Sequence, residues 1–221
     1  MSGMLNSSIG RKFAMALSAF FLMFFLLQHL VINSLSVISP EMFNDVSYFM
    51  GNNPVVQFLL QPVLLIGVLF HFIMGFVLEI KNRKARQISY AKNNGGANSS
   101  WMSRNMIWSG AAILLFMIFH FNDFWVPEIV EKYVDGTSQV GKDFHHHVVE
   151  MFVDPLRVGV YTLAFVFLAL HLLHGFDSAF QSVGANNKYT KGLKTFGKLY
   201  ATLVPLGFIV IALYHHFVHI H

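Results

Sequence analysis

The stretch His171-Leu172-Leu173-His174-Gly175 lies inside the fourth of five long apolar segments. A similar phrase, His71-Phe72-Ile73-Met74-Gly75, lies inside the second segment, and His29 and His120 lie inside the first and third. A polar side chain at membrane depth is costly and normally faces a protein interior where it has a partner. These four histidine positions are therefore the candidates for function.

The composition is that of an integral membrane protein. The chain has 221 residues, 55% of them hydrophobic, and a mean hydropathy of +0.54. Charged residues make up 12%, about half of what a soluble domain carries. Cysteine is absent, which excludes disulfides, thiolate-bound iron–sulfur clusters, covalently attached haem and a thiol nucleophile.

Five apolar runs are each long enough to cross a bilayer as a helix. We expect a single all-α domain over residues 1–221, with transmembrane helices at about residues 13–38, 55–80, 101–125, 155–181 and 199–218. Pro127 should close the third helix. A short loop carrying Glu41 and Asp45 follows the first helix, and residues 148–152 could form a short surface helix.

The charges of the loops predict the orientation. Twelve of the 15 Lys and Arg residues lie in the N-terminal segment and in the second and fourth loops. The other side holds Lys132, Lys142 and Arg157 together with nine of the eleven acidic residues. The positive-inside rule then predicts a cytoplasmic N-terminus and a C-terminus on the outer side.

Depth sorts the four histidines into two pairs. His29 and His120 lie 17 and 16 residues from the cytoplasmic ends of their helices, or roughly 25 Å. His71 and His171 each lie 10 residues from the same side, or about 15 Å. His174 would lie about 4.5 Å closer to the cytoplasm than the level of His71, so we favour His171 as its partner.

Two matched pairs in a helix bundle are typical of two stacked bis-histidine haems. A single histidine at such a depth would more simply form an interhelical hydrogen bond. Because covalent attachment is excluded, the haems would be of b type. Gly75 and Gly175 lie one turn beyond His71 and His171 and could let a porphyrin edge approach the helix, although small residues also serve close helix packing.

The residues that carry a family resemblance span the chain: Gln28-His29-Leu30-Val31-Ile32-Asn33, His71-x-x-x-Gly75, His120, and the run from His171 to Gln181, HLLHGFDSAFQ. In this order and spacing they resemble the single-chain, five-helix, di-haem cytochrome b subunit of succinate dehydrogenase and fumarate reductase.

The resemblance implies a fold, ligands and partners. The first four helices would bundle around two b haems, with His71 and His171 on the iron nearer the cytoplasm and His29 and His120 on the distal one. The cytoplasmic face would dock an iron–sulfur subunit that carries the flavoprotein subunit. Electrons would pass to or from a membrane quinone, with menaquinone favoured, in the respiratory chain and tricarboxylic acid cycle. The location would be the inner membrane of a bacterium, with no nucleic-acid partner.

Two further sites are only loosely defined by the sequence. Haem propionates need cationic or backbone donors, and the candidates are Arg11, Lys12, Lys81 and Arg83 on the cytoplasmic side and Arg157 and His147 on the distal side. A quinone site needs a proton-exchanging group near the outer surface. The resemblance points to the first outer loop, which offers Glu41 and Asp45, while Asp123 and the run His145-His146-His147 are further candidates.

Two other functions compete with this interpretation. One is a di-haem anchor for another quinone-linked enzyme, of the hydrogenase or formate dehydrogenase type. The HLLHGFDSAFQ phrase argues against such a partner. The other is a small transporter, which would show discontinuous helices and inverted repeats at mid-membrane.

Overall fold

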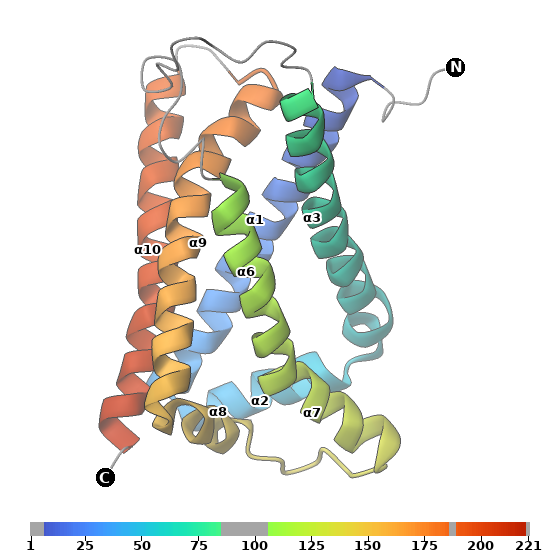
Figure 1. The fold of residues 1–221 in the computed structure, drawn as a ribbon. Helices are drawn as coiled ribbons and strands as arrows, with labels where there is room; N and C mark the ends of the chain where they lie inside the picture. Colours follow the sequence, from blue (N-terminus) through green and yellow to red (C-terminus); the bar gives the residue numbers. More distant parts are fainter. Residues whose placement is uncertain (1–6, 85–105, 186–188, 220–221) are drawn as a thin grey trace.

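A computed structural model describes residues 7–84, 106–185 and 189–219, and every regular element in them is a helix. Five helical spans are long and apolar enough to cross a membrane (Figure 1): Ser8–Ile38, Val56–Lys84, Met106–Val134, Pro155–Ser182 and Thr190–His219. The expectation of an all-α, multi-pass membrane protein with five such helices is confirmed.

Several spans are divided into shorter helical elements. The α-helices are α1 (Ser8–Ile38), α2 (Pro40–Asn52), α3 (Gln61–Lys84), α6 (Met106–His120), α7 (Val126–Ile129), α8 (Phe144–Val153), α9 (Pro155–Ser182) and α10 (Thr190–His219). Single π-helical turns precede α3, at Val56–Leu60, and flank α7, at Phe121–Trp125 and Val130–Val134. The fifth span begins at Thr190, nine residues before the expected start at residue 199.

The segment after the first span is helix α2 and not the expected loop. Ser39 ends α1 through its N–H, which bonds to the carbonyl of Leu35 at 2.8 Å, and its hydroxyl accepts from the N–H of Met42 at 3.3 Å. Pro40 occupies the first helical position, where its missing N–H costs nothing. One serine therefore turns the chain and starts a second helix. The predicted short surface helix is present as α8.

The third span continues past Pro127 to Val134, although we expected Pro127 to close it. Residues 101–105, the expected start, lie outside the described residues. Proline has no N–H for the carbonyl four residues earlier, which here belongs to Asp123. Nε2 of His147 lies 2.9 Å from that oxygen. The π-helical turn and the hydrogen bond from His147 allow the helix to continue through the proline.

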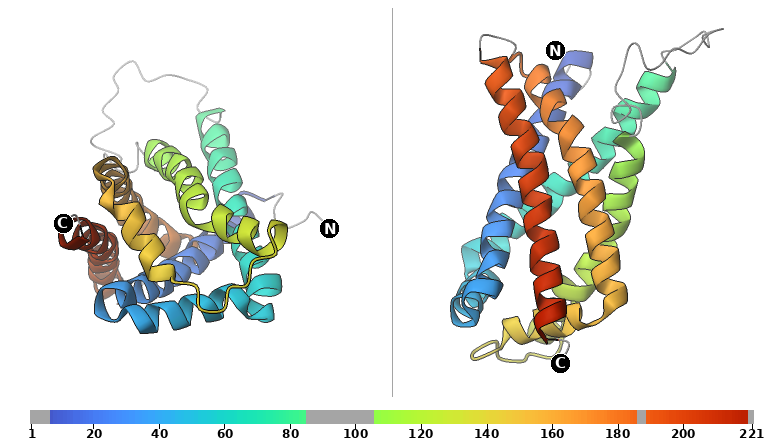
Figure 2. Two further views of the ribbon diagram at one scale, coloured as in Figure 1. Left: turned by 90° about the horizontal axis from the view of Figure 1, so that it is seen from below. Right: turned by 90° about the vertical axis from the view of Figure 1, so that its left-hand side faces the viewer.

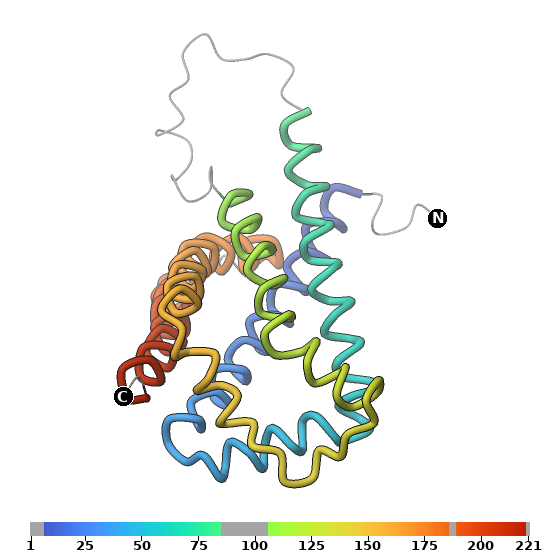
Figure 3. Tube along the Cα trace, turned by 60° about the horizontal axis from the view of Figure 1, so that its bottom comes forward, coloured from blue at the N-terminus to red at the C-terminus, as the bar shows by residue number. Residues whose placement is uncertain are grey.

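The N-terminal end of α1 and the C-terminal end of α10 lie at opposite ends of the bundle (Figure 1). We call the end that carries α2, α7 and α8 the capped end; α2 crosses beneath the bundle there (Figures 2 and 3). The buried apolar core lies mainly between α1, α9 and α10. By contrast, α3 buries only Met74 and α6 only Ser109.

Candidate functional site

The first pair of histidines joins α3 to α9. The rings of His71 and His171 have centroids 6.3 Å apart, with an angle of 66° between their planes. His171 is the member of the HLLHG phrase whose ring lies beside His71; His174 follows it by three residues on α9. Both paired rings are half-buried.

The second pair joins α1 to α6 on the side of the capped end. The rings of His29 and His120 have centroids 5.8 Å apart and are nearly perpendicular, at 87°. Phe25 stacks on His29 and Phe116 stacks on His120, each from the preceding turn of the same helix. Each pair therefore draws its two rings from two different spans, and apolar rings pack around the second pair.

A serine on α1 fixes the tautomer of His71. The hydroxyl of Ser18 donates to the carbonyl of Met15 at 2.8 Å, so it has only lone pairs to offer to Nδ1 of His71 at 3.1 Å. Nδ1 must then carry the proton, and Nε2 keeps its lone pair. An imidazole held in this tautomer is ready to bind a metal through Nε2.

The arrangement is repeated around His171. The hydroxyl of Ser109 donates to the carbonyl of Met106 at 2.9 Å and lies 3.3 Å from Nδ1 of His171. The two glycines also face equivalent methionines. A Cβ built on Gly75 would lie 3.7 Å from the methyl group of Met15, and a Cβ built on Gly175 would lie 3.5 Å from the methyl group of Met106. α1 with α3 and α6 with α9 are thus two copies of one helix-pair arrangement.

Sequence reasoning missed both serines, although a signal was present. Ser18 precedes His29 by eleven residues, and Ser109 precedes His120 by eleven. Eleven residues are close to three helical turns, so the serine and the histidine share one face, about 16 Å apart along the helix. Both helices carry the same pattern: Met-x-x-Ser, and then a histidine eleven residues after the serine.

The two pairs fit the b-type haem iron that the resemblance implies. Two imidazole rings that would hold one metal ion between them, each through a nitrogen about 2 Å from it, have centroids about 6 Å apart. The distances of 6.3 and 5.8 Å meet this requirement. Nδ1 of His120 is buried and has no hydrogen-bond partner among the described residues, which also suits a ring whose partner is not a protein group.

No known family, curated protein or solved structure matches the chain. The function is therefore argued from the paired histidines and their surroundings.

A buried carboxylate lies next to the second pair. Asp123 is 6% exposed and follows His120 by three residues. The hydroxyl of Tyr161 donates to its Oδ2 at 2.9 Å, and Nε of Arg157 lies 3.4 Å from the same oxygen. Arg157 and His147, the expected distal propionate contacts, are thus both gathered at Asp123, one at its carboxylate and one at its carbonyl.

The remaining predicted residues lie at the surface or at the helix ends. Glu41 and Asp45 are exposed on α2, and the pKa of Glu41 is lowered by a backbone hydrogen bond and by the hydroxyl of Ser39. Lys81 is exposed in the last turns of α3, and Arg11 is half-buried near the start of α1. Arg83 pairs with Glu79 at 2.6 Å. The structure does not bring Glu41 or Asp45 to a histidine pair through any contact of the described residues.

Proposed function

We propose that the chain is the membrane-anchor cytochrome b subunit of a succinate:quinone oxidoreductase. The observation that carries this proposal is the two facing histidine pairs, at 6.3 and 5.8 Å, on four different spans. The family resemblance supplies the identity of the complex, because paired histidines alone would serve any di-haem membrane protein.

His71 and His171 would hold one b haem, and His29 and His120 would hold the other. Held by these histidine pairs, the haems would supply one-electron transfer. The chain's own residues do the rest. Ser18 and Ser109 keep Nε2 of His71 and His171 unprotonated and aligned, and the aromatic rings beside His29 and His120 keep water away from the second site.

The basic end of the bundle would face the cytoplasm and dock the iron–sulfur subunit, which in turn carries the flavoprotein. Succinate and fumarate would react on that flavoprotein, not on this chain. The capped end would face the outer side of a bacterial inner membrane, where a quinone, by resemblance menaquinone, exchanges electrons and protons. Asp123 is the buried acid nearest the second pair along the chain and joins Glu41 and Asp45 as a candidate for the proton exchange.

The test is the spectrum and haem content of the purified protein. Dithionite reduction should give b-type bands, with two haems per chain. A chain that binds no haem would contradict the proposal and also the alternative of a hydrogenase or formate dehydrogenase anchor. Purification without dissociating the complex separates these two, because a flavoprotein with succinate dehydrogenase activity should accompany the chain.

A further inference from the structure

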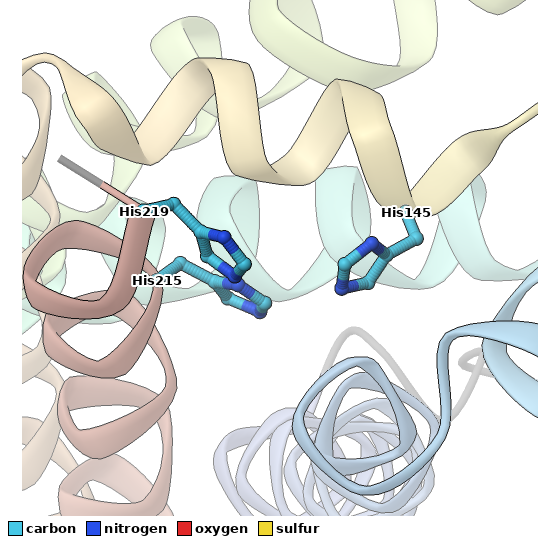
Figure 4. A group of neighbouring side chains, drawn as sticks. All are labelled: His145, His215 and His219. Carbon is cyan, nitrogen blue, oxygen red and sulfur yellow. The ribbon is translucent and has the colours of Figure 1, made fainter. Parts of the chain in front are cut away.

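Three histidines outside the two pairs converge at the capped end of the bundle (Figure 4). His145 comes from α8, and His215 and His219 come from successive turns of α10. The ring centroid of His145 lies 5.5 Å from that of His215 and 6.2 Å from that of His219. The rings of His215 and His219 stack with centroids 5.6 Å apart. One ring nitrogen from each lies within 4.8 Å of one from each of the others.

The most buried member has a ring nitrogen without a partner. His215 is 0% exposed, and its Nδ1 has no hydrogen-bond partner among the described residues. The hydroxyl of Ser36 donates to the carbonyl of Asn33 at 2.7 Å, so it accepts from Nε2 of His215 at 2.9 Å. Nδ1 of His215 is therefore unprotonated, with a free lone pair in a buried position.

Ser36 also holds the ring of His145. Nε2 of His145 donates to the carbonyl of Ser36 at 3.0 Å, which leaves Nδ1 of His145 unprotonated. The backbone N–H of His145 donates to the side-chain oxygen of Asn44 at 2.7 Å, so α2 holds the start of α8 in place. Two neutral imidazoles are thus oriented by one residue of α1.

We propose that His145, His215 and His219 bind a divalent transition metal ion of the Zn²⁺ type. Imidazole nitrogens suit Zn²⁺ and Cu²⁺, whereas Ca²⁺ and Mg²⁺ require oxygen ligands. Three protein ligands leave a fourth position for water or a ligand. Tetrahedral binding needs nitrogens about 3.3 Å apart, so a bound ion would draw the three rings closer than the 4.8 Å within which their nitrogens now lie.

The site is separate from the proposed haems and does not depend on them. Ser36 lies seven residues beyond His29 on α1, or about 10 Å along the helix. The metal would join α8 to the end of α10, so its binding would stabilise the capped end by linkage.

The experiment uses the full chain with its haem content intact, purified without a polyhistidine tag, stripped with a chelator and titrated with ZnCl₂ against a competing chelator. We expect one tightly bound Zn²⁺ per chain and a higher melting temperature. His145→Ala and His219→Ala should each weaken binding roughly tenfold or more, since loss of even an outer-shell partner costs about 10- to 100-fold. Both side chains are partly exposed, so the test does not rely on replacing the fully buried His215.

The sequence offers matched controls next to the ligands. His146 is exposed and lies 3.6 Å from Glu150, and Nδ1 of His216 lies 3.0 Å from the carbonyl of Phe152. His146→Ala and His216→Ala should bind Zn²⁺ as the wild type does, and X-ray absorption should show three nitrogen ligands at about 2.0 Å. Absence of Zn²⁺ binding, or binding that falls equally in the controls, would overturn the proposal.

Discussion

Oγ of Ser18 on α1 lies 3.1 Å from Nδ1 of His71 on α3, and it can only accept the proton of that ring. Ser109 on α6 stands in the same relation to His171 on α9. The two serines thus prepare the two facing rings in the same tautomer, from two helices that are not themselves the source of those rings. The orientation of the His71 and His171 rings therefore depends on the packing of α1 on α3 and of α6 on α9.

Replacing Ser18 by Ala should raise the midpoint potential of one haem. A hydrogen bond from Nδ1–H makes the imidazole a stronger donor to the iron and so favours the ferric state. A difference of about 1 kcal/mol in the strength of this hydrogen bond between the ferric and ferrous states corresponds to roughly 40 mV for a one-electron couple, at about 59 mV per tenfold change. Redox titration of the two b-type signals measures the shift.

Ser34→Ala is the matched control for this prediction. The hydroxyl of Ser34 also bonds back to its own helix, to the carbonyl of Leu30 at 2.8 Å. The control should leave both potentials unchanged. A shift of similar size in Ser34→Ala, or none in Ser18→Ala and Ser109→Ala, would show that the serines do not act on the iron ligands.

His71→Ala and His171→Ala should each lower the haem content from two per chain to one. Each variant would lose one of the two proposed ligands of the same haem iron, so the spectrum that remains should be the same in both variants and should belong to the pair His29 and His120. His174→Ala should retain two haems. Loss of the other signal, or of either haem in the His174 variant, would contradict the pairing.

The sequence was sufficient for features that depend on local pattern. Five spans follow from run length and hydropathy, and the pairing of His71 with His171 and of His29 with His120 follows from counting residues along helices. The contact between Ser18 and His71 joins positions 53 residues apart. Its signal, the eleven-residue spacing to His29, becomes meaningful only when the packing of α1 against α3 is known.

Two local expectations differed from the structure because a distant residue intervenes. The sequence predicts that Pro127 ends the third span. The carbonyl of Asp123, which Pro127 cannot bond, instead lies next to a ring nitrogen of His147, 24 residues away. The loop after Ile38 is helical because Ser39 serves both as the end of α1 and as the cap of α2. The sequence Ser-Pro-Glu is a common start of a helix, but here it also follows the end of the first span. Local pattern alone does not show that it does both.

Tyr161→Phe should destabilise the protein by about 2 kcal/mol. The tyrosine hydroxyl donates to the buried carboxylate of Asp123, and hydrogen bonds to charged groups contribute about 1.5–3 kcal/mol. SDS-induced unfolding in mixed micelles gives the free energy. Tyr214→Phe, an exposed tyrosine on α10, should change it little. Equal effects of the two substitutions would argue against a role for the hydroxyl bond.

Low pH should weaken the hydrogen bonds by which Asp143 connects α2 to the start of α8. Asp143 caps α8, and its pKa is lowered by hydrogen bonds from the N–H of His146 and from Asn44, both at 3.0 Å. A lowered carboxyl pKa contributes stability that is complete above the ordinary value of 3.8 and is lost as the pH falls through the lower folded value. The melting temperature of the wild type should therefore exceed that of Asp143→Ala at pH 6, and the difference should shrink below about pH 4. Asp135→Ala, an exposed acid in the loop before α8, should show no such convergence.

His147 and Pro127 should be energetically coupled through the carbonyl of Asp123. His147→Ala removes the donor at 2.9 Å from that oxygen, and loss of a hydrogen bond at a buried acceptor costs about 1–3 kcal/mol. Pro127→Ala restores an N–H four residues beyond Asp123, where a regular helix would place its own donor. The double variant should therefore be less destabilised than the sum of the two single variants, by about 1 kcal/mol in a double-mutant cycle. Strict additivity would mean that His147 does not replace the hydrogen bond that the proline removes.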